Sequence, residues 1–541
     1  MKKNDIYRVK IENWGSNGEG ICRIGGMAVF VRGAAKDDLC DIRILKVQKR
    51  HAFARVETII QGSHHRIEND CPYFDKCGGC AYRHISYEEE LHLKQERVSD
   101  ALKRIGGIDM PVKPVTPSPD IDGYRNKAIF QTANTRSAPV IGFYRRGSHD
   151  VIPIEHCALQ CHLTNQVVRV IADFAAENNL EMYDETKHTG TLRHVFTRTS
   201  SEGQIQVCLV SATKHIDNID KLTTRLVEEF PQISGIMLIH NEDVGNVALT
   251  GPITTLYGEQ YLTDTLCGLT FRISPYSFFQ INHAQTENLY SIALDFADLT
   301  GTGNVLDLYC GIGTITLNLA KKAKHVYGVE IIPEAIEDAR MNAVFNEITN
   351  VDFICADAGE AAKEIVSSKT TIDLLTVDPP RKGLSSQTIE AILEIGPARI
   401  IYISCDPATL ARDLGLLKEH YTVQHVQPVD MFPRTTHVET VVLLSQQKPN
   451  DRIEIDLDLD ELDPTPAESK ATYKEIKEYV RQNFNLKVSS LYISQVKRKY
   501  GLEVGENYNL SKSENQKTPQ CPPDKEEAIK QALIYFQMIT E

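Results

Sequence analysis

One thiol lies where a short strand runs into a helix. The stretch IYISCDPATLARDL (401–414) is typical of a buried strand, a turn and a helix, and Cys405 directly follows the strand. A cysteine thiolate is a strong nucleophile, and a helix N-terminus beside it would favour the thiolate form. The stretch THVETVVLL puts Glu439 at the start of a later strand, on the same rim if the sheet is doubly wound. The two residues predict covalent catalysis with one nucleophile and one general base.

Methylation of a pyrimidine ring carbon needs this pair of groups. Carbon 5 of uracil is a poor nucleophile, but addition of a thiolate to carbon 6 makes an enolate that raises the electron density at carbon 5. Carbon 5 can then take a methyl group from a sulfonium, and a base must remove its proton before the thiolate can leave. Cys405 is therefore the candidate nucleophile and Glu439 the candidate base. A buried, inert thiol is the other interpretation of Cys405, and the neighbouring DPPRKG and HVE sequences speak against it.

A glycine-bearing turn is the candidate site for the methyl donor. VLDLYCGIGTITLNLA (305–320) reads as strand, loop and helix, and Gly311 and Gly313 would let the backbone approach a ligand closely. Glu330 ends the next strand, about 20 residues on, where an acid commonly bonds ribose hydroxyls. The third glycine of a dinucleotide fingerprint is missing, and the carboxylate of Asp307 would repel a pyrophosphate. These features favour the cationic S-adenosylmethionine over a dinucleotide.

Two further carboxylates follow later strands of the same pattern. Asp357, in FICADAGE, could accept a hydrogen bond from the adenine amino group. Asp378, in TVDPPRKG, precedes two prolines that stiffen its loop. Because DPP also occurs in amine methyltransferases, it indicates a class of site and leaves the reaction open.

A group of cysteines precedes the first long helix. Three of them form the pattern C-x5-C-x2-C in residues 66–84: Cys71, Cys77 and Cys80. Cys157, in PIEHCALQC, is the candidate fourth ligand, and Cys161 is the second choice. The spacing alone allows zinc, including a Cys3His site with His156.

Several domains have to position these residues, because 541 residues are too many for one ordinary domain. Short strands and glycine turns predict a small OB-like β-barrel first, and a later alternation of strands and helices predicts a Rossmann-like, doubly wound α/β domain. A mixed α+β central domain lies between them, so the fold class is multidomain α/β. The expected boundaries are 1–60 for the barrel, 61–84 for the cysteine loop of the central domain, 85–118 for a helix that joins the catalytic domain, 119–267 for the central domain, 268–446 for the methyltransferase domain, 447–470 for an acidic linker and 471–541 for a small helical extension.

Charge is distributed unevenly over a chain with a net charge of −14. Residues 1–60 hold 12 Lys and Arg against 7 Asp and Glu, whereas residues 451–468 hold 1 against 8. The basic barrel favours contact with RNA, and Arg125, Lys127 and the FYRRGSH run are further candidates. No apolar run approaches the ~18 residues of a membrane span. The few, scattered cysteines and the absence of a signal peptide fit a cytoplasmic protein without a membrane partner.

The motifs DLYCGIG, DPPRKG, SCDPATLARDL and HVET together resemble the RNA uracil-5-methyltransferase family, which includes bacterial 23S rRNA enzymes and a tRNA enzyme. The resemblance spans residues 1 to about 446, and SPYSFFQIN (274–282) is similar to the family's glutamine motif. It implies a nucleophile at Cys405, a base at Glu439 and a TRAM domain in the barrel. The cofactor contacts that it implies are Gln280, Tyr309, Glu330, Asp378 and Asp357.

The resemblance also bears on the substrate. The 23S rRNA branch has a four-iron–four-sulfur cluster on this cysteine pattern, with its fourth ligand where Cys157 stands, whereas the tRNA branch lacks both the cluster and the TRAM domain. It therefore predicts methylation of carbon 5 in an unpaired or flipped uridine of 23S rRNA. A tRNA uracil-5-methyltransferase is the alternative, followed by an amino-nitrogen methyltransferase and a non-enzymatic RNA-binding factor. Residues 451–541 lie beyond the resemblance, and for them we expect a contact with the ribosomal precursor or with an accessory protein.

Overall fold

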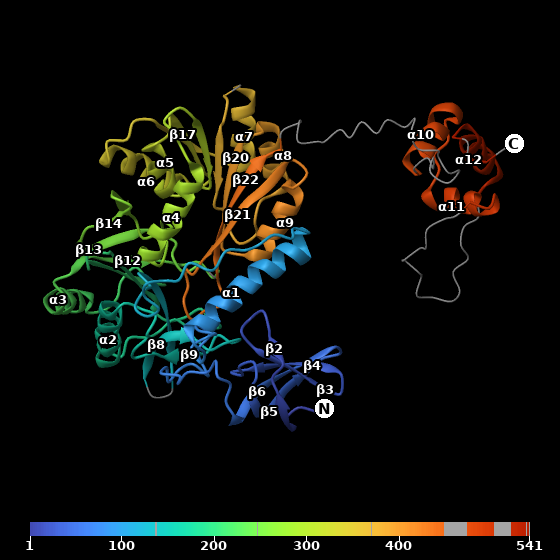
Figure 1. The fold of residues 1–541 in the computed structure, drawn as a ribbon. Helices are drawn as coiled ribbons and strands as arrows, with labels where there is room; N and C mark the ends of the chain where they lie inside the picture. Colours follow the sequence, from blue (N-terminus) through green and yellow to red (C-terminus); the bar gives the residue numbers. More distant parts are fainter. Residues whose placement is uncertain are drawn as a thin grey trace. The chain divides into compact units, whose positions relative to one another are not determined.

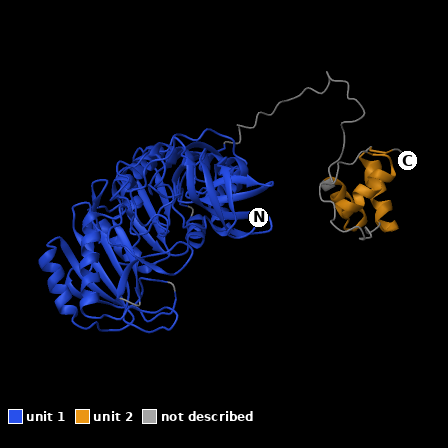
Figure 2. Ribbon diagram, turned by 90° about the horizontal axis from the view of Figure 1, so that it is seen from below, with its two compact units in different colours: residues 1–449 blue, residues 450–541 orange. Residues whose placement is uncertain are grey.

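The computed structural model describes residues 1–447, 473–502 and 521–539, apart from positions 136, 137, 246, 369 and 537. The chain forms two compact units, residues 1–449 and 450–541, which Figure 2 colours separately. From residue 448 onward, the acidic linker expected over 447–470 lies outside the described residues. No helix in the described ranges is long and apolar enough to cross a membrane.

The first sheet is a small barrel-like layer of six strands in the order β1-β5-β6-β4-β3-β2. Glycine turns alone suggest five strands, and the additional one is the two-residue β2. Alternate residues of the strands point inward, among them Val29, Val31, Ile42 and Ala52, and form one apolar core. The strands are β1 (Ile6–Lys10), β2 (Asn13–Trp14), β3 (Gly20–Ile24), β4 (Met27–Arg32), β5 (Leu39–Val47) and β6 (His51–Gln61).

Helix α1 (Tyr87–Ala101) connects this barrel with the catalytic domain (Figure 1). Ser86 is the N-cap of this helix, since its hydroxyl accepts a hydrogen bond from the Glu89 amide at 3.3 Å. Near the start of the helix, the indole of Trp14 in β2 donates to the Glu89 carboxylate at 3.0 Å. The helix continues as a π-turn (Leu102–Gly106) that packs on α9. It therefore spans the distance from the barrel to the catalytic domain.

The central domain is a mixed seven-stranded sheet in the order β13-β12-β11-β10-β7-β8-β9. Two helices, α2 (His162–Glu177) and α3 (Ile219–Glu229), pack against one face and share its core. A hairpin of β14 (Leu262–Leu266) and β15 (Leu269–Ile273) leads into the next domain. The seven strands are β7 (Lys127–Asn134), β8 (Pro139–Tyr144), β9 (Val151–Pro153), β10 (Leu192–Thr199), β11 (Ile205–Ser211), β12 (Ile233–His240) and β13 (Ile253–Gly258).

The catalytic domain has a second seven-stranded sheet in the order β18-β17-β16-β19-β20-β22-β21. The first five of these strands are parallel, and β22 and β21 are antiparallel to their neighbours. Strand order reverses between β16 and β19, which is where open α/β sheets bind ligands, beyond the carboxyl ends of the strands. The strands are β16 (Asn304–Leu308), β17 (His325–Glu330), β18 (Val351–Cys355), β19 (Leu374–Val377), β20 (Arg399–Ser404), β21 (Tyr421–Val429) and β22 (Glu439–Gln446).

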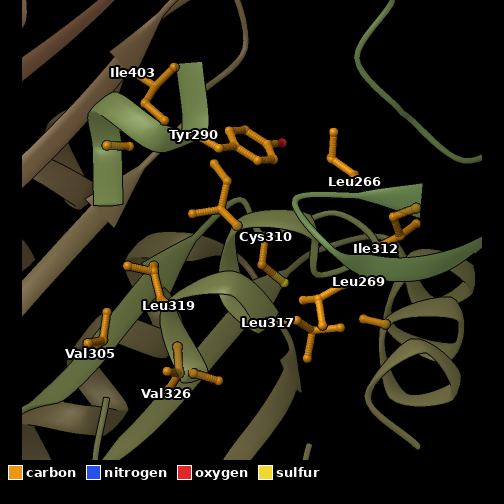
Figure 3. Close-up of a cluster of buried hydrophobic side chains, with 14 of the residues drawn as sticks. Leu266, Leu269, Tyr290, Val305, Cys310, Ile312, Leu317, Leu319, Val326 and Ile403 are labelled. Carbon is orange, nitrogen blue, oxygen red and sulfur yellow. The ribbon is translucent and has the colours of Figure 1, made fainter. Parts of the chain in front are cut away.

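Helices cover both faces of this sheet, as the alternation of strands and helices predicts (Figure 1). One face packs against α4, α5 and α6, and the other against α7, α8, α9 and the end of α1. Figure 3 shows the first of these cores, in which Leu319 lies near Val305 and Val326 and Leu317 lies near Leu269. The helices are α4 (His283–Ala297), α5 (Thr314–Ala320), α6 (Pro333–Phe345), α7 (Ala358–Ser367), α8 (Ser386–Ile395) and α9 (Pro407–Leu417).

The second unit is a small helical bundle with its own apolar core. Within the small helical extension predicted over 471–541, the first two helices are α10 (Tyr473–Phe484) and α11 (Ser490–Lys499). A third helix, α12 (Pro523–Tyr535), packs with both of them and was not predicted. Its apolar residues Ile529 and Leu533 are fully buried against the first two helices.

Candidate active site

The loop after β16 has the backbone conformation of a ligand-binding turn. Tyr309, Gly311 and Gly313 all have positive φ angles, of 67°, 55° and 83°. A side chain added at Gly311 would meet nothing within 4 Å, so glycine is needed there for the backbone conformation and leaves open space beside the loop. Gly313 directly precedes α5, whose first amides point toward the loop. The turn therefore offers a ligand close access to the backbone.

Glu330 is held beside this loop by backbone amides. Its Oε1 accepts hydrogen bonds from the amides of Ile331 and Ile332, at 2.8 and 3.0 Å, and its Oε2 accepts one from Gly311, at 3.3 Å. The carboxylate is therefore fixed in orientation before any ligand arrives, and its remaining lone pairs can accept from ribose hydroxyls. This is the position in which the sequence analysis expects a ribose contact.

Asp307 does not face the ligand space as the sequence argument assumes. It is buried, and its two carboxylate oxygens accept hydrogen bonds from the hydroxyls of Thr316 and Thr376, at 2.5 and 2.6 Å. Burial raises the pKa of Asp307 to about 6. The side chain thus ties β16 to α5 and β19, and the preference for a cationic ligand has to come from other acids.

Two predicted cofactor contacts lie in loops on either side of these elements. Asp357 is exposed and caps α7, because its Oδ1 accepts from the Gly359 amide at 2.9 Å. Gln280 is buried shortly before α4. Its backbone carbonyl accepts a hydrogen bond from the side-chain amide of Asn126 in the central domain at 2.9 Å. The central domain therefore helps to hold the loop that carries Gln280.

Strand pairing brings Cys405 and Glu439 to adjacent positions. β20 pairs with β22 in antiparallel register, with Ser404 opposite Thr440. Cys405 is the next residue after Ser404, and Glu439 is the residue before Thr440, so both lie just beyond the last pair of this register, at the carboxyl end of β20. Glu439 is buried, and its Oε2 has no hydrogen-bond partner among the described residues. An unpaired buried carboxylate oxygen is costly and typical of a functional group.

The pKa values of this group of side chains are all raised. Burial raises the pKa of Cys405 to about 11, and the nearby Glu439 and Asp378 add to the effect. Burial also raises the pKa of Asp378 to about 7, with a further contribution from Asp307, and lifts that of Glu439 well above its usual range. Arg381 opposes the shifts at Cys405 and Glu439. An excess of buried acids disfavours further negative charge and suits a cationic ligand.

The helix N-terminus does not produce a ready thiolate, which corrects the expectation from the sequence. Asp406 caps α9, and its Oδ1 accepts from the amides of Ala408 and Thr409 at 2.9 and 3.0 Å. These amides are therefore already paired with a carboxylate and do not stabilise a neighbouring sulfur anion. The raised pKa of Cys405, about 11, instead favours the thiol form at neutral pH.

The four predicted cluster ligands line one cavity of about 280 Å³. These residues are Cys71, Cys77, Cys80 and Cys157. Amides of Leu159 and Gln160 donate to the Cys157 thiol, and the Gly79 amide lies 3.4 Å from the sulfur of Cys77. In the described part of the chain, no group of three or more His, Cys, Asp and Glu could hold a metal ion. The thiols therefore surround a space and do not converge on one point, as the ligands of a single zinc ion would.

Two of the expected RNA contacts are internal to the protein. Arg125 lines the cysteine cavity, and Arg146 of the FYRRGSH run donates to the carbonyl of Cys80 at 2.5 Å. Lys127 is half-buried, and burial lowers its pKa to about 8. Arg145 of the same run is exposed and stays the candidate RNA contact of the central domain.

The sequence analysis missed an aromatic cluster on the outer face of the barrel. The rings of Phe30 and Phe53 stack at 5.7 Å, and His51 meets both rings edge-on. The parallel pairing of β4 with β6 puts Phe30 opposite Phe53 and Arg32 opposite Arg55. The alternation in MAVFVR and HAFAR contains the signal, because the residues between these are buried. Half-buried aromatic rings beside arginines form a surface on which bases can stack.

Comparisons with known proteins agree with this geometry. A family model described as tRNA (Uracil-5-)-methyltransferase matches residues 86–447, and a TRAM domain model matches residues 2–56. An uncharacterized RNA methyltransferase of Clostridium tetani is 41% identical over 447 residues, which are 82% of this chain and 97% of that protein. One of Halalkalibacterium halodurans is 41% identical over 447 residues, or 82% of this chain and 98% of that protein.

A solved structure is also similar over most of the first unit. It is the crystal structure of Pyrococcus abyssi tRNA (uracil-54, C5)-methyltransferase in complex with S-adenosyl-L-homocysteine. The match has a TM-score of 0.66 and 27% sequence identity, and it covers 81% of this chain and 99% of that chain.

Proposed function

The chain belongs to the RNA uracil-5-methyltransferase family, whose members use S-adenosylmethionine, and we propose that it methylates carbon 5 of an unpaired or flipped uridine in 23S rRNA. The observation that carries the proposal is the register of β20 and β22, which makes Cys405 and Glu439 neighbours at the carboxyl end of β20. A nucleophile and a base side by side are what the reaction at carbon 5 needs and what methylation of an amino nitrogen does not need.

In the proposed mechanism, Cys405 gives its proton to water, and its sulfur bonds to carbon 6 of the uracil as the double bond between carbons 5 and 6 opens into an enolate with the carbonyl at carbon 4. S-adenosylmethionine supplies an electrophilic methyl group on a sulfonium, and carbon 5 of the enolate takes this methyl group as the bond between methyl and sulfur breaks. Glu439 then removes the proton from carbon 5. The double bond between carbons 5 and 6 forms again, and the bond between Cys405 and carbon 6 breaks.

The residues proposed to hold the methyl donor lie around the loop after β16. We assign the ribose to Glu330, the adenine amino group to Asp357, and the remaining contacts to Gln280, Tyr309 and Asp378. Gly311 and Gly313 provide the close approach of the backbone. The raised pKa values of Asp378 and Glu439 support a cationic donor, because a positive charge beside them stabilises their ionised forms.

The cysteine cavity fits a four-iron–four-sulfur cluster better than zinc. Four thiols around a space of about 280 Å³ suit a cluster that is larger than one ion. The amides directed at the sulfurs of Cys77 and Cys157, and the half-buried Arg125 that lines the cavity, would stabilise thiolate ligands. We propose that such a cluster is held by four cysteines: Cys71, Cys77, Cys80 and Cys157. The cluster would stabilise the fold of the central domain, since methyl transfer from a sulfonium needs no electron transfer from a cluster.

The barrel is the proposed RNA platform. Phe30, His51 and Phe53 would stack on unpaired bases, and the exposed Arg55 would contact an adjoining phosphate. A uridine has to leave its stack before a thiolate can reach carbon 6, so a platform for single-stranded RNA fits the chemistry.

A tRNA substrate is the second candidate. The Pyrococcus abyssi protein is named a tRNA methyltransferase, and its match covers 81% of this chain, more than the two thirds that the family model covers. The extent of the fold therefore does not separate rRNA from tRNA enzymes, and the preference for 23S rRNA rests on the cysteine pattern.

The experiment that tests the proposal incubates the protein with labelled S-adenosylmethionine and separate pools of rRNA and tRNA that lack the modification. We expect 5-methyluridine in 23S rRNA, located by mass mapping. Label in tRNA alone would establish the second candidate. Label on an amino nitrogen, or RNA binding without any label transfer, would refute the assignment of the reaction.

We further propose that the second unit contacts the ribosomal precursor. The curated relatives match 82% of the chain, and the family match ends at residue 447, so this unit is an addition to the shared enzyme. A chain that ends at residue 449 should methylate protein-free 23S rRNA normally and modify precursor particles less well. Equal activity on both substrates would contradict this role.

A further inference from the structure

The loop that precedes the proposed base is anchored by three other parts of the protein. It comprises residues 430–438, between β21 and β22, and ends directly at Glu439. The Asp430 amide donates to the Thr116 carbonyl at 3.0 Å, and the Pro433 carbonyl accepts from the Tyr124 hydroxyl at 2.9 Å. From α1, Arg97 donates to the Thr436 carbonyl at 2.6 Å.

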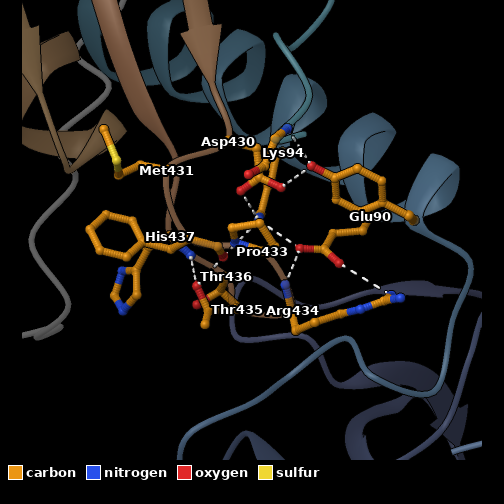
Figure 4. A network of polar contacts seen from close by, with 12 residues as sticks. Glu90, Lys94, Asp430, Met431, Pro433, Arg434, Thr435, Thr436 and His437 are labelled. Atoms are coloured by element: carbon orange, nitrogen blue, oxygen red, sulfur yellow. Dashed lines mark hydrogen bonds and ion pairs between the residues drawn. The ribbon is translucent and has the colours of Figure 1, made fainter. Parts of the chain in front are cut away.

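A buried group of charges forms the centre of this anchoring (Figure 4). The Lys94 ammonium donates to the carboxylates of Glu90 and Asp430, at 2.7 and 2.6 Å, and to the Phe432 carbonyl at 3.1 Å. The second oxygen of Asp430 accepts from the Tyr87 hydroxyl at 2.8 Å. The ammonium thus has three acceptors, all of them buried or part-buried, and two of them belong to the loop.

Arg434 completes the group and has a strained backbone. Its φ angle is 67°, in the left-handed region that residues with a side chain rarely adopt. Its amide donates to Glu90 at 2.7 Å, and its carbonyl accepts from the amides of Ala81 and Tyr82, at 2.8 and 3.2 Å. The guanidinium lies 3.7 Å from the other oxygen of Glu90. Helix α1 and the cysteine loop therefore hold this conformation from both sides of the residue.

Buried ion pairs of this kind are weak sources of stability, because desolvation offsets most of their attraction. They do specify one arrangement, since every charged group has to meet its partner. In this protein, the buried group of charges fixes the path of the chain into Glu439. Cys405 belongs to the end of β20 and is not part of the loop.

We propose that Lys94 and Asp430, together with Glu90, are positioning residues for Glu439. They hold loop 430–438 so that the carboxylate of Glu439 reaches the proton on carbon 5 after methyl transfer. The inference rests on the proposed function. It predicts that loss of the ion pairs of Lys94 slows proton removal from carbon 5, and therefore release of the RNA from Cys405. Formation of the bond to carbon 6 should be slowed less.

The test follows the covalent adduct between protein and RNA with time. Full-length wild type, Asp430→Asn and Lys94→Met are mixed with RNA and S-adenosylmethionine labelled in its methyl group, then quenched in denaturant. Labelled RNA reports methyl transfer, and labelled RNA that migrates with the protein reports adduct not yet resolved. Lys103→Met is the matched control, because it removes an exposed lysine paired with Asp109 close to the end of the same helix.

We expect the adduct to decay about tenfold more slowly in Asp430→Asn and in Lys94→Met than in the wild type, with the rate of methyl transfer changed by no more than about twofold. The control should match the wild type. Adduct decay at the wild-type rate in a folded Asp430→Asn protein would overturn the inference, as would equal losses in both steps.

A charge left unpaired by one substitution can prevent folding, so the double variant Lys94→Met with Asp430→Leu is measured as well. This variant removes both charges, and it should fold while still releasing the adduct slowly. Wild-type release from the double variant would show that the charges are not needed. Failure of the proposed function itself is distinguishable, because the wild type would then form no adduct and make no 5-methyluridine.

Discussion

Cys405 and Glu439 are neighbours because Ser404 pairs with Thr440 across two antiparallel strands. The two residues come from opposite ends of their strands, and only the reversal of β22 relative to β20 brings them to the same edge of the sheet. A parallel last strand that carried the same residues would put them on opposite edges. The antiparallel strand is thus what makes a two-residue covalent mechanism possible here.

Substitution of either residue should stop turnover at a different step. Cys405→Ala should abolish methyl transfer, because nothing else activates carbon 5. Glu439→Gln should lower turnover by about 100-fold or more and accumulate a denaturant-stable adduct of protein and RNA, since the base cannot remove the proton. Denaturing gels with labelled methyl donor measure both effects.

Cys355→Ala is the matched control for these variants, because Cys355 is an exposed thiol in the same domain. It should retain wild-type activity. Turnover by Cys405→Ala, or turnover by Glu439→Gln without any adduct, would contradict the assigned roles.

The sequence predicts the catalytic domain well because its signals are local. Strand, glycine turn and helix follow each other in 305–320, and strand, turn and helix follow each other around Asp357, Asp378 and Cys405. Contacts between distant segments could not be predicted in this way. Nothing near Lys94 indicates that its ammonium will meet Asp430, and nothing in the pattern shows that Arg125 faces the cysteine cavity.

Asp307 illustrates the same limit within a single motif. Its place in the strand was read correctly, but the partners of its carboxylate, Thr316 and Thr376, lie on two other elements. A side chain at a strand end can face a ligand or a neighbouring element, and only the packing decides between them. The pKa of Cys405 depends in the same way on burial and on acids from other strands.

Removal of one ring from the barrel surface should weaken RNA binding. In Phe53→Ala we expect the stacking of about one base to be lost, which is worth about 1–3 kcal/mol and should appear as a raised KM for RNA with kcat nearly unchanged. Ile59→Ala is the control, because this exposed residue lies on the same strand outside the aromatic cluster. An unchanged KM in a Phe53→Ala protein that melts like the wild type would exclude the barrel face as the platform.

The cysteine cavity makes a prediction about composition. Protein purified without oxygen should be brown and contain about four iron and four sulfide per chain, as a four-iron–four-sulfur cluster requires. Cys80→Ser should lose most of the iron and the visible absorbance, because Cys80 is one of the four thiols that line the cavity.

Cys161→Ser provides the comparison, since Cys161 is not among the described residues that line the cavity. It should keep its iron. Stoichiometric zinc in place of iron, or a loss of iron in Cys161→Ser equal to that in Cys80→Ser, would argue against the four-cysteine cluster.

The raised pKa of Cys405 predicts how its reactivity depends on pH and on the methyl donor. With a pKa of about 11 in the ligand-free protein, the thiol is protonated at neutral pH, and the thiolate fraction should rise about tenfold per pH unit below the pKa. Alkylation of Cys405 by iodoacetamide, followed by mass spectrometry of its peptide, should rise with the same slope.

A positive charge near the thiol favours the thiolate, so bound S-adenosylmethionine should lower the pH midpoint of alkylation, whereas S-adenosylhomocysteine lacks the sulfonium charge and should shift it less. Both ligands shield the thiol sterically to a similar degree, which slows alkylation but does not move the midpoint. Identical midpoints with the two ligands would mean that the sulfonium does not lie close enough to Cys405 to influence its ionisation. The methyl group would then be too far from a uracil bonded to that thiol.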